Sequence, residues 1–134
     1  MPSIFTKILS GEIPCAKVYE DDYVLAFLDI GPVHPGHTLV IPEKEVITIF
    51  DADEETLKAL IIAIKKVAKA VKEATHCDGL NVLQNNFRAS GQLVDHLHFH
   101  LIPRFANDGL KHWPQGKYEE GQMEELQKRI KGAL

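Results

Sequence analysis

The most regular pattern of hydrophobic and polar positions in this chain of 134 residues covers residues 53–75. Apolar residues recur there at spacings of three and four, and lysines fill the positions between them, which is the pattern of an amphipathic helix. Asp51 or Asp53 can cap its amino end, and Glu54 and Glu55 suit the first turn. We therefore expect one long helix with a buried face made of Leu57, Leu60, Ile61, Ile64, Val67, Ala68 and Val71.

Shorter runs rich in β-branched and aromatic residues predict strands on both sides of this helix. Asp21-Asp22 separates the first two runs, and the loop 86–92 separates the last two, as in an antiparallel hairpin. The expected strands cover residues 16–20, 23–29, 38–41, 80–85 and the run that begins at His96.

Two short helices complete the pattern. Ser3 can cap the first, over residues 4–10. Residues 119–131 predict the second, with Leu126 and Ile130 as its apolar contacts. This order of elements predicts the α+β class: an antiparallel five-stranded sheet with the long helix on one face and short helices near the ends of the chain. The length favours a single domain, 1–134.

The run from His96 alternates histidines with large apolar residues. Side chains two apart in a strand point to the same face, so His96, His98 and His100 should line one surface at a spacing of roughly 6.7 Å. The residues between them then face a core; they are Leu97, Phe99 and Leu101. Packing alone rarely requires such a row of imidazoles, so we look for function here.

Composition narrows the functional classes. The chain is 45% hydrophobic and carries a net charge of −4, so no overall basic field is available to hold nucleic acid or an anionic membrane. No apolar stretch approaches the length of a membrane span, and the first residues lack a signal-peptide pattern. Cys15 and Cys77 stand alone. We expect a cytoplasmic protein with reduced thiols.

Three interpretations of the histidine row remain open: a surface patch without a role, a metal site, and a nucleophilic histidine with supporting neighbours. No Cys-x-x-Cys motif and no carboxylate on the histidine face accompany the row, which weakens the metal interpretation. Neutral phosphate-binding donors lie just upstream, and Arg88 adds a cation, which favours the nucleophile. These donors are Asn85, Asn86, Ser90, Gly91 and Gln92.

The run 96–102 resembles the signature of the histidine triad (HIT) superfamily of nucleotide hydrolases and transferases. Further segments resemble the family in the usual order, so that the resemblance covers a core of residues 3–104 and leaves 105–134 as a carboxyl-terminal tail. These segments are Gly11–Pro14, Tyr19–Asp22, Ala26–Ile30, Pro35–Pro42, Gln84–Asn86 and Gly91–Gln92.

The resemblance implies attack on the α-phosphate of a nucleotide, with a nucleotidyl-histidine intermediate. His98 matches the nucleophile, His96 and His100 match its supporting histidines, and His37 resembles the family's fourth histidine. The implied substrates are purine nucleotide conjugates: dinucleoside polyphosphates, nucleoside phosphoramidates or adenylylated compounds. A non-catalytic, regulatory nucleotide-binding protein is the alternative.

The resemblance also implies a binding site. Asn85 and Gln92 match residues that hold the α-phosphate, and Asp29 matches the residue that binds the ribose hydroxyls. Trp113 lies in a His-Trp-Pro segment that, in related homodimers, approaches the partner's site. The apolar walls around the base would be Ile4, Phe5, Ile8, Phe27 and Ile30.

Some positions depart from the family. Zinc-binding members carry cysteines where this chain has Ser3 and Thr6, and a histidine where it has Glu45, so no structural zinc is expected. No resident cofactor is expected either, although Mg²⁺ can accompany a polyphosphate substrate. Leu93 replaces a frequent hydroxyl residue, and Phe87 replaces a frequent glycine.

Overall fold

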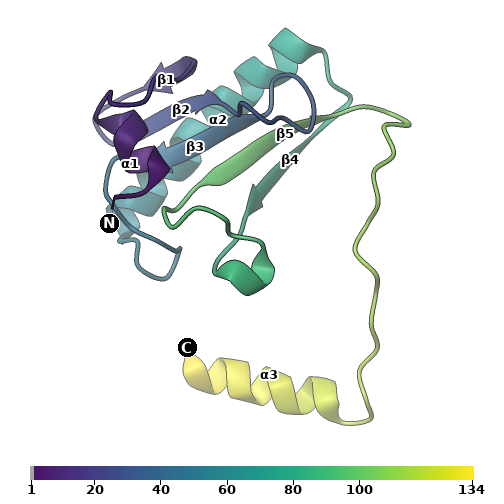
Figure 1. Cartoon of the computed structure of the whole chain (residues 1–134). Helices are drawn as coiled ribbons and strands as arrows, with labels where there is room; N and C mark the ends of the chain where they lie inside the picture. Colours follow the sequence, from purple (N-terminus) through teal and green to yellow (C-terminus); the bar gives the residue numbers. More distant parts are fainter. Residues whose placement is uncertain (1) are drawn as a thin grey trace.

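The computed structural model describes residues 2–134 and confirms the α+β class. Neighbouring strands are antiparallel throughout the order β1-β2-β3-β5-β4 (Figure 1). The helices are α1 (Ile4–Leu9), α2 (Glu54–Thr75) and α3 (Gln122–Ala133), with a 3₁₀ turn η1 (Arg88–Ser90). The strands are β1 (Lys17–Glu20), β2 (Val24–Leu28), β3 (Thr38–Pro42), β4 (Gly79–Gln84) and β5 (Phe99–Arg104).

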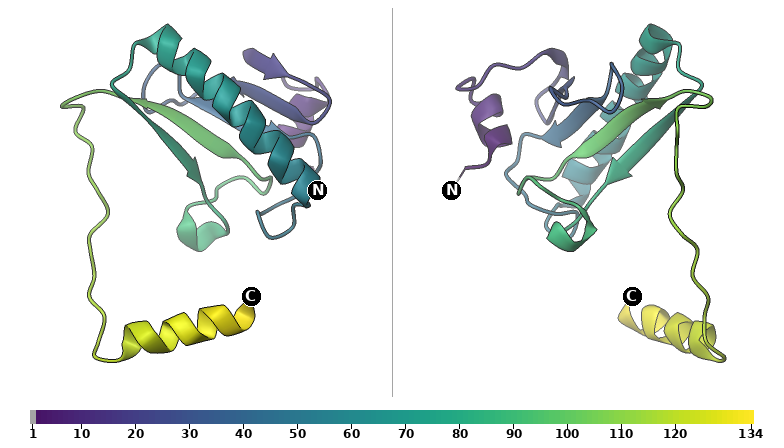
Figure 2. Two further views of the ribbon diagram at one scale, coloured as in Figure 1. Left: turned by 180° about the vertical axis from the view of Figure 1, so that it is seen from behind. Right: turned by 45° about the vertical axis from the view of Figure 1, so that its right-hand side comes forward.

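Helix α2 crosses one face of the sheet, as Figure 2 shows from behind. It begins where predicted, because the Asp53 side chain accepts a hydrogen bond from the Thr56 amide at 2.8 Å. It ends at His76, whose φ of 53° is left-handed. Its inner face packs on strand residues in one buried cluster: Val24, Ala26, Val40, Leu60, Ala63, Ile64, Val67, Val71, Leu97 and Leu101.

Helix α1 packs on the opposite face of the sheet. Ser3 caps it as predicted, accepting from the Thr6 amide at 3.1 Å. Phe5 and Ile8 point inward from α1. They join a second buried cluster with alternate residues of β2 and β3: Leu25, Phe27, Leu39 and Ile41. The middle of the sheet is therefore covered on both faces, which gives the adjoining site a rigid support.

The histidine run departs from the expected hairpin. Strand β5 begins only at Phe99, and residues 85–98 form an irregular connection with η1 in place of a short loop. Before Phe99 the main-chain amides bond to loop carbonyls instead of to a neighbouring strand. The Leu97 amide donates to the Val46 carbonyl at 2.7 Å, and the His96 amide donates to the Val94 carbonyl. The alternation survives nevertheless, because Leu97 and Leu101 enter the α2 cluster.

The tail leaves the sheet at a fixed point. Asp108 accepts two hydrogen bonds from the Arg104 guanidinium, at 2.8 and 2.9 Å, and one from the Leu110 amide. Beyond it the chain extends away from the sheet, and α3 stands apart from it (Figure 1). This helix starts later than predicted and has no buried residue; Ile130 is 62% exposed and lacks the expected apolar partner within the described chain.

No helix among residues 2–134 combines the length and apolarity that a membrane crossing needs.

Leu60→Ala tests the packing of α2. Leu60 is 1% exposed in the α2 cluster, and alanine is the better helix former, so any loss measures packing alone. We expect the free energy of unfolding in urea to fall by about 2–5 kcal/mol. Lys69→Ala, at an exposed position of the same helix, should change it by less than about 0.5 kcal/mol. Equal effects of the two substitutions would contradict this packing.

Candidate active site

A cavity of about 310 Å³ lies beside α1 and contains most of the predicted site residues. Its volume falls at the lower end of the range typical of small-molecule sites. Asp29, His98 and His100 bring polar groups to it. Every predicted wall residue lines it: Ile4, Phe5, Ile8, Phe27 and Ile30. The structure therefore brings together predicted residues from three separate segments of the sequence, 4–8, 27–30 and 98–100, in one place.

The His98 ring is held in one orientation. Its Nδ1 lies 2.7 Å from the main-chain carbonyl oxygen of His96. A carbonyl oxygen only accepts, so Nδ1 carries the proton and Nε2 keeps a free lone pair. Phe5 packs edge-on against the ring, with centroids 5.1 Å apart. Burial lowers the pKa of His98, although the hydrogen bond to His96 and the charge of Asp29 act to raise it. The ring is therefore neutral at pH 7.

A second hydrogen-bond chain fixes the tautomer of His100. The Val33 amide donates to His37 Nδ1 at 3.1 Å, so the proton of a neutral His37 sits on Nε2. That Nε2 donates to His100 Nδ1 at 2.9 Å, which leaves the His100 proton on Nε2. Burial lowers the pKa of His100 to about 4, and the neighbouring His98 and His37 contribute. The cavity thus holds a donor imidazole beside an acceptor imidazole, with ring centroids 5.1 Å apart.

Asp29 supplies the only carboxylate among the residues that line this cavity. Its Oδ1 accepts from the Gly31 amide at 2.8 Å, and its Oδ2 lies 3.6 Å from His37 Nε2. Burial lowers the pKa of His37 despite the opposing effect of Asp29. Potential metal-ligand atoms of Asp29, His37 and His100 lie within 4.8 Å of one another. An ion could use all three only by replacing the His37–His100 hydrogen bond.

His96 lies away from the cavity, in contrast to the other two histidines of the row. Its ring is fully buried, and its Nε2 donates to the Pro42 carbonyl at 3.0 Å. Its Nδ1 accepts from the Ser3 hydroxyl at 3.4 Å. The imidazole therefore anchors the main chain between α1 and β3, and the His96 carbonyl is the group that orients His98.

Ser3, Thr6 and Glu45, the positions for which the sequence resemblance raised the question of zinc, form a hydrogen-bond cluster. Ser3 and Thr6 hydroxyls lie 3.2 Å apart, and Thr6 Oγ1 donates to Glu45 Oε1 at 2.9 Å. Structural zinc is held by four cysteine or histidine side chains as a rule. Two hydroxyls, a carboxylate and the already bonded His96 do not fit that ion.

The predicted phosphate-binding residues lie in the connection before β5. Gly91 lines the cavity. The Asn85 side chain packs beside this glycine, since a Cβ in place of the Gly91 hydrogen would lie 3.6 Å from Asn85 Nδ2. The Asn85 amide is therefore next to the cavity wall. Gln92 is buried: its Oε1 accepts from the Phe87 amide at 2.8 Å and its Nε2 donates to the Ile47 carbonyl at 2.6 Å. Its side chain joins the loop at Ile47 to the loop at Phe87 and does not line the cavity. Phosphate contact by Asn85 and Gln92 stays a prediction.

Trp113 is 79% exposed in the tail and does not line the cavity, so its role also stays a prediction. The sequence did not single out several other lining residues. The alternation of strand 38–41 would have indicated Leu39, whereas no local pattern indicated the loop residues. These additional residues are Ile13, Pro14, Cys15, Leu28, Leu39 and Val94.

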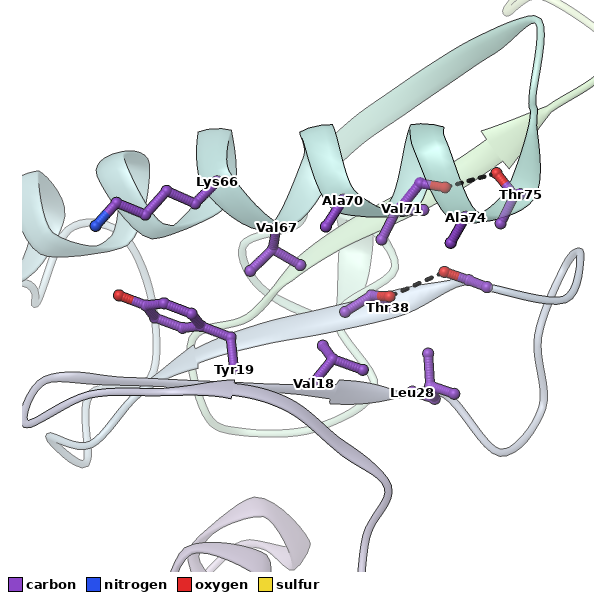
Figure 3. Close-up of a pocket in the computed structure, with 11 residues that line it drawn as sticks. Val18, Tyr19, Leu28, Thr38, Lys66, Val67, Ala70, Val71, Ala74 and Thr75 are labelled. Carbon is purple, nitrogen blue, oxygen red and sulfur yellow. Dashed lines mark hydrogen bonds between the residues drawn. The ribbon is translucent and has the colours of Figure 1, made fainter.

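A second cavity, of about 380 Å³, lies between α2 and the strands β1–β3 (Figure 3). Its two threonine hydroxyls are already bonded to the main chain: Thr38 donates to the Gly36 carbonyl at 2.9 Å and Thr75 to the Val71 carbonyl at 2.7 Å. It contains no histidine and its lining is largely apolar. It therefore offers little for catalysis, and the histidine cavity is the candidate active site.

Comparisons with known proteins agree with this geometry. A family model described as the HIT domain matches residues 10–107. An uncharacterized HIT-like protein of Methanocaldococcus jannaschii is 43% identical over 96% of this chain and 98% of its own. The adenosine 5'-monophosphoramidase of Schizosaccharomyces pombe is 44% identical over 78% of this chain and 75% of its own. The crystal structure of a HIT family member from Bacillus subtilis gives a TM-score of 0.93 at 39% identity, covering 100% of this chain and 98% of that one. With its fold, its histidine cavity and these similarities in agreement, the chain belongs to the HIT family.

Proposed function

We propose that this protein is a nucleotide hydrolase or nucleotidyl transferase in which His98 Nε2 attacks the α-phosphorus of a nucleotide conjugate. The observation that carries the proposal is the pair of neutral imidazoles with opposite tautomers at one cavity. His98 offers a lone pair there, and His100 offers an N–H. The similarity to a monophosphoramidase supports hydrolysis of a nucleotide conjugate.

In the proposed first step, the Nε2 lone pair of His98 forms a bond to phosphorus, and the leaving group departs with the electron pair of its own bond to phosphorus. The modified ring is cationic, and its Nδ1–H remains directed at the His96 carbonyl oxygen, which stabilises the charge. The His100 Nε2–H donates to a phosphate oxygen. Water then attacks phosphorus and gives up a proton, which balances the proton taken up by the departed leaving group; the P–N bond returns its electrons to Nε2, and a nucleoside monophosphate is released.

The remaining contacts in this proposal bind the nucleoside. The free Oδ2 of Asp29 accepts hydrogen bonds from ribose hydroxyls, and the apolar walls suit a purine. Asn85 supplies a neutral donor to phosphate, and Gln92 holds the loop that positions it. No resident metal takes part; Mg²⁺ enters only with a polyphosphate substrate. We place the activity in the cytoplasm, where the free thiols of Cys15 and Cys77 persist.

Leu93 and Phe87 favour a second candidate, a non-catalytic purine-nucleotide sensor that uses the same cavity. Leu93 is 76% exposed where family members often carry a hydroxyl. A sensor would bind AMP tightly, yet it would form no covalent adduct and release no product.

We propose that the protein acts as a homodimer joined through β4 and α2. Strand β4 lies at the end of the strand order, so one of its edges is unpaired. Ile61 and Ile62, 57% and 58% exposed, line one groove together with Val82 of that strand. Pairing of β4 with its copy would continue the sheet and cover this groove, and the partner's Trp113 could then approach the site.

His98→Ala tests the nucleophile directly. We expect turnover of an adenosine phosphoramidate to fall by roughly 10⁴-fold or more, because no other group in the cavity offers a free lone pair in the same place. Intact mass spectrometry without acid should find an adenylyl adduct on the wild type and none on the variant, while AMP binding persists. His76→Asn serves as the matched control and should keep full activity, because His76 lies at the carboxyl end of α2, outside the cavity, and asparagine tolerates its left-handed conformation. Equal turnover by wild type and His98→Ala would refute the proposed nucleophile, and tight AMP binding without adduct or turnover would favour the sensor.

The pH profile of kcat/KM should reflect the burial of His98. Burial lowers its pKa below the ordinary 6.5, so the neutral, nucleophilic form persists when a free histidine would be protonated. We expect the acid limb of kcat/KM to be centred below pH 6.5, the value for a free histidine, because the neutral form of His98 persists to lower pH. The unfolded chain takes up these protons more readily, so stability also falls below 6.5, and circular dichroism must verify the fold at each point. An acid limb centred above 6.5 with an intact fold would contradict this environment.

Ile62→Glu tests the proposed dimer. A carboxylate on this exposed apolar position would have to be desolvated in the interface, so the variant should sediment as a monomer at concentrations where the wild type is dimeric. Val18→Glu provides the control, because Val18 is 49% exposed on β1 at the opposite edge of the sheet. A monomeric wild type, or loss of the dimer only in the control variant, would contradict the interface.

A further inference from the structure

Two exposed phenylalanines stack on each other at one end of the sheet. Phe50 precedes α2 and is 76% exposed; Phe87 precedes η1 and is 59% exposed. Their ring centroids lie 6.0 Å apart and their planes differ by 17°. Figures 1 and 2 show the two connections at the same end of the molecule. We call this pair the aromatic shelf.

Hydrogen bonds between the two connections hold the shelf in place. The Ile49 amide donates to Asn86 Oδ1 at 2.8 Å. Asn86 is fixed in turn by Gln84, through reciprocal bonds of 2.9 and 2.8 Å. The buried Gln92 joins the same connections by bonding both Ile47 and Phe87. These hydrogen bonds fix the main chain of both connections, so the backbone positions of Phe50 and Phe87 are set before any ligand binds.

Phe87 occupies a backbone conformation that favours glycine. Its φ is 69°, a region that residues with a Cβ seldom adopt. Burial of the Phe87 ring in a core does not compensate for this strain, because the ring is mostly exposed. A strained residue that is held by its surroundings and directs an apolar ring outward suggests a binding role for that ring.

The shelf adjoins the candidate active site through one tight loop. The Phe87 carbonyl accepts from the Ser90 and Gln92 amides, which closes the loop so that Gly91 reaches the cavity wall. Arg88 follows Phe87 and is mostly exposed; one guanidinium nitrogen donates to the Leu93 carbonyl at 2.8 Å, and another lies 3.4 Å from an Asp95 carboxylate oxygen at the surface. Along the chain, the Phe87 ring of the shelf is thus followed directly by the Arg88 cation and then by Gly91, which lines the His98 cavity.

We propose that the aromatic shelf binds the planar base of the leaving group, which makes dinucleoside polyphosphates the favoured substrate class. This inference rests on the proposed function. One nucleoside occupies the cavity with its α-phosphate at His98, the remaining phosphates pass Arg88, and the second base stacks on Phe50 and Phe87. Aromatic side chains bind bases of any sequence through their faces, and arginine neutralises phosphate without requiring a resident metal. A small amine leaving group would reach neither feature.

The test compares kcat/KM for diadenosine triphosphate with kcat/KM for adenosine phosphoramidate, which share the adenylyl group. We expect Phe50→Ala to lower this ratio by about 10-fold, the size expected from loss of one stacking contact. Phe50→Trp should preserve the ratio because it retains an aromatic face. Tyr118→Ala, which removes an exposed aromatic ring in the tail, should leave the ratio unchanged. An unchanged ratio in Phe50→Ala would overturn the proposal, as would a change of oligomeric state in that variant, which would assign the shelf to an interface.

A binding measurement separates failure of the shelf from failure of the proposed function. If the wild type turns over neither compound, the catalytic proposal fails. Calorimetry on the same proteins would then decide the shelf: tighter binding of diadenosine triphosphate than of AMP by the wild type, reduced in Phe50→Ala, supports it. Equal binding of the two nucleotides by the wild type overturns it.

Discussion

One hydrogen bond, from His98 Nδ1–H to the His96 carbonyl, is the constraint on which the candidate active site depends. It directs the lone pair of Nε2 away from the main chain. Its acceptor is fixed because the His96 ring is anchored at both nitrogens, and the next amide, that of Leu97, bonds to Val46. Packing reinforces this arrangement from both faces of the sheet, since Leu97 enters the α2 cluster and Phe5 of α1 contacts the His98 ring.

The histidines of the candidate active site are neutral hydrogen-bonding groups. Burial keeps His37, His98 and His100 largely unprotonated at pH 7, so their tautomers, rather than their charges, decide which nitrogen donates and which accepts. The main chain sets both tautomers, through the His96 carbonyl and the Val33 amide. In the proposed function, neutral donors bind the phosphate, so a chain with a net charge of −4 needs no basic surface for it. The proposed covalent step then creates a single positive charge at the point where phosphate charge is present.

The sequence predicted the parts of this arrangement that follow from local periodicity. The spacing of apolar residues in 53–75 predicted α2, and the alternation from His96 predicted that Leu97 and Leu101 face a core. Asp29 and the apolar walls that the resemblance implied line one cavity, and their contacts with a nucleoside stay a prediction. Alternation alone could not separate His96 from His98, because burial of the His96 ring depends on Ser3 and Pro42, which are distant in sequence. Nor could it reveal that the Gln92 side chain bonds to both Ile47 and Phe87 and so joins two loops, or that the apolar stripe of α3 is not buried within the described chain.

Nitrogen-15 NMR of the histidine side chains tests the central claim most directly, because the chemical shifts of Nδ1 and Nε2 distinguish a protonated nitrogen from one with a free lone pair. For the protein at pH 7, the account predicts that His98 is protonated at Nδ1 and free at Nε2, whereas His100 is protonated at Nε2. A His98 ring protonated at Nε2, or on both nitrogens, would leave no lone pair for phosphorus and would contradict the account.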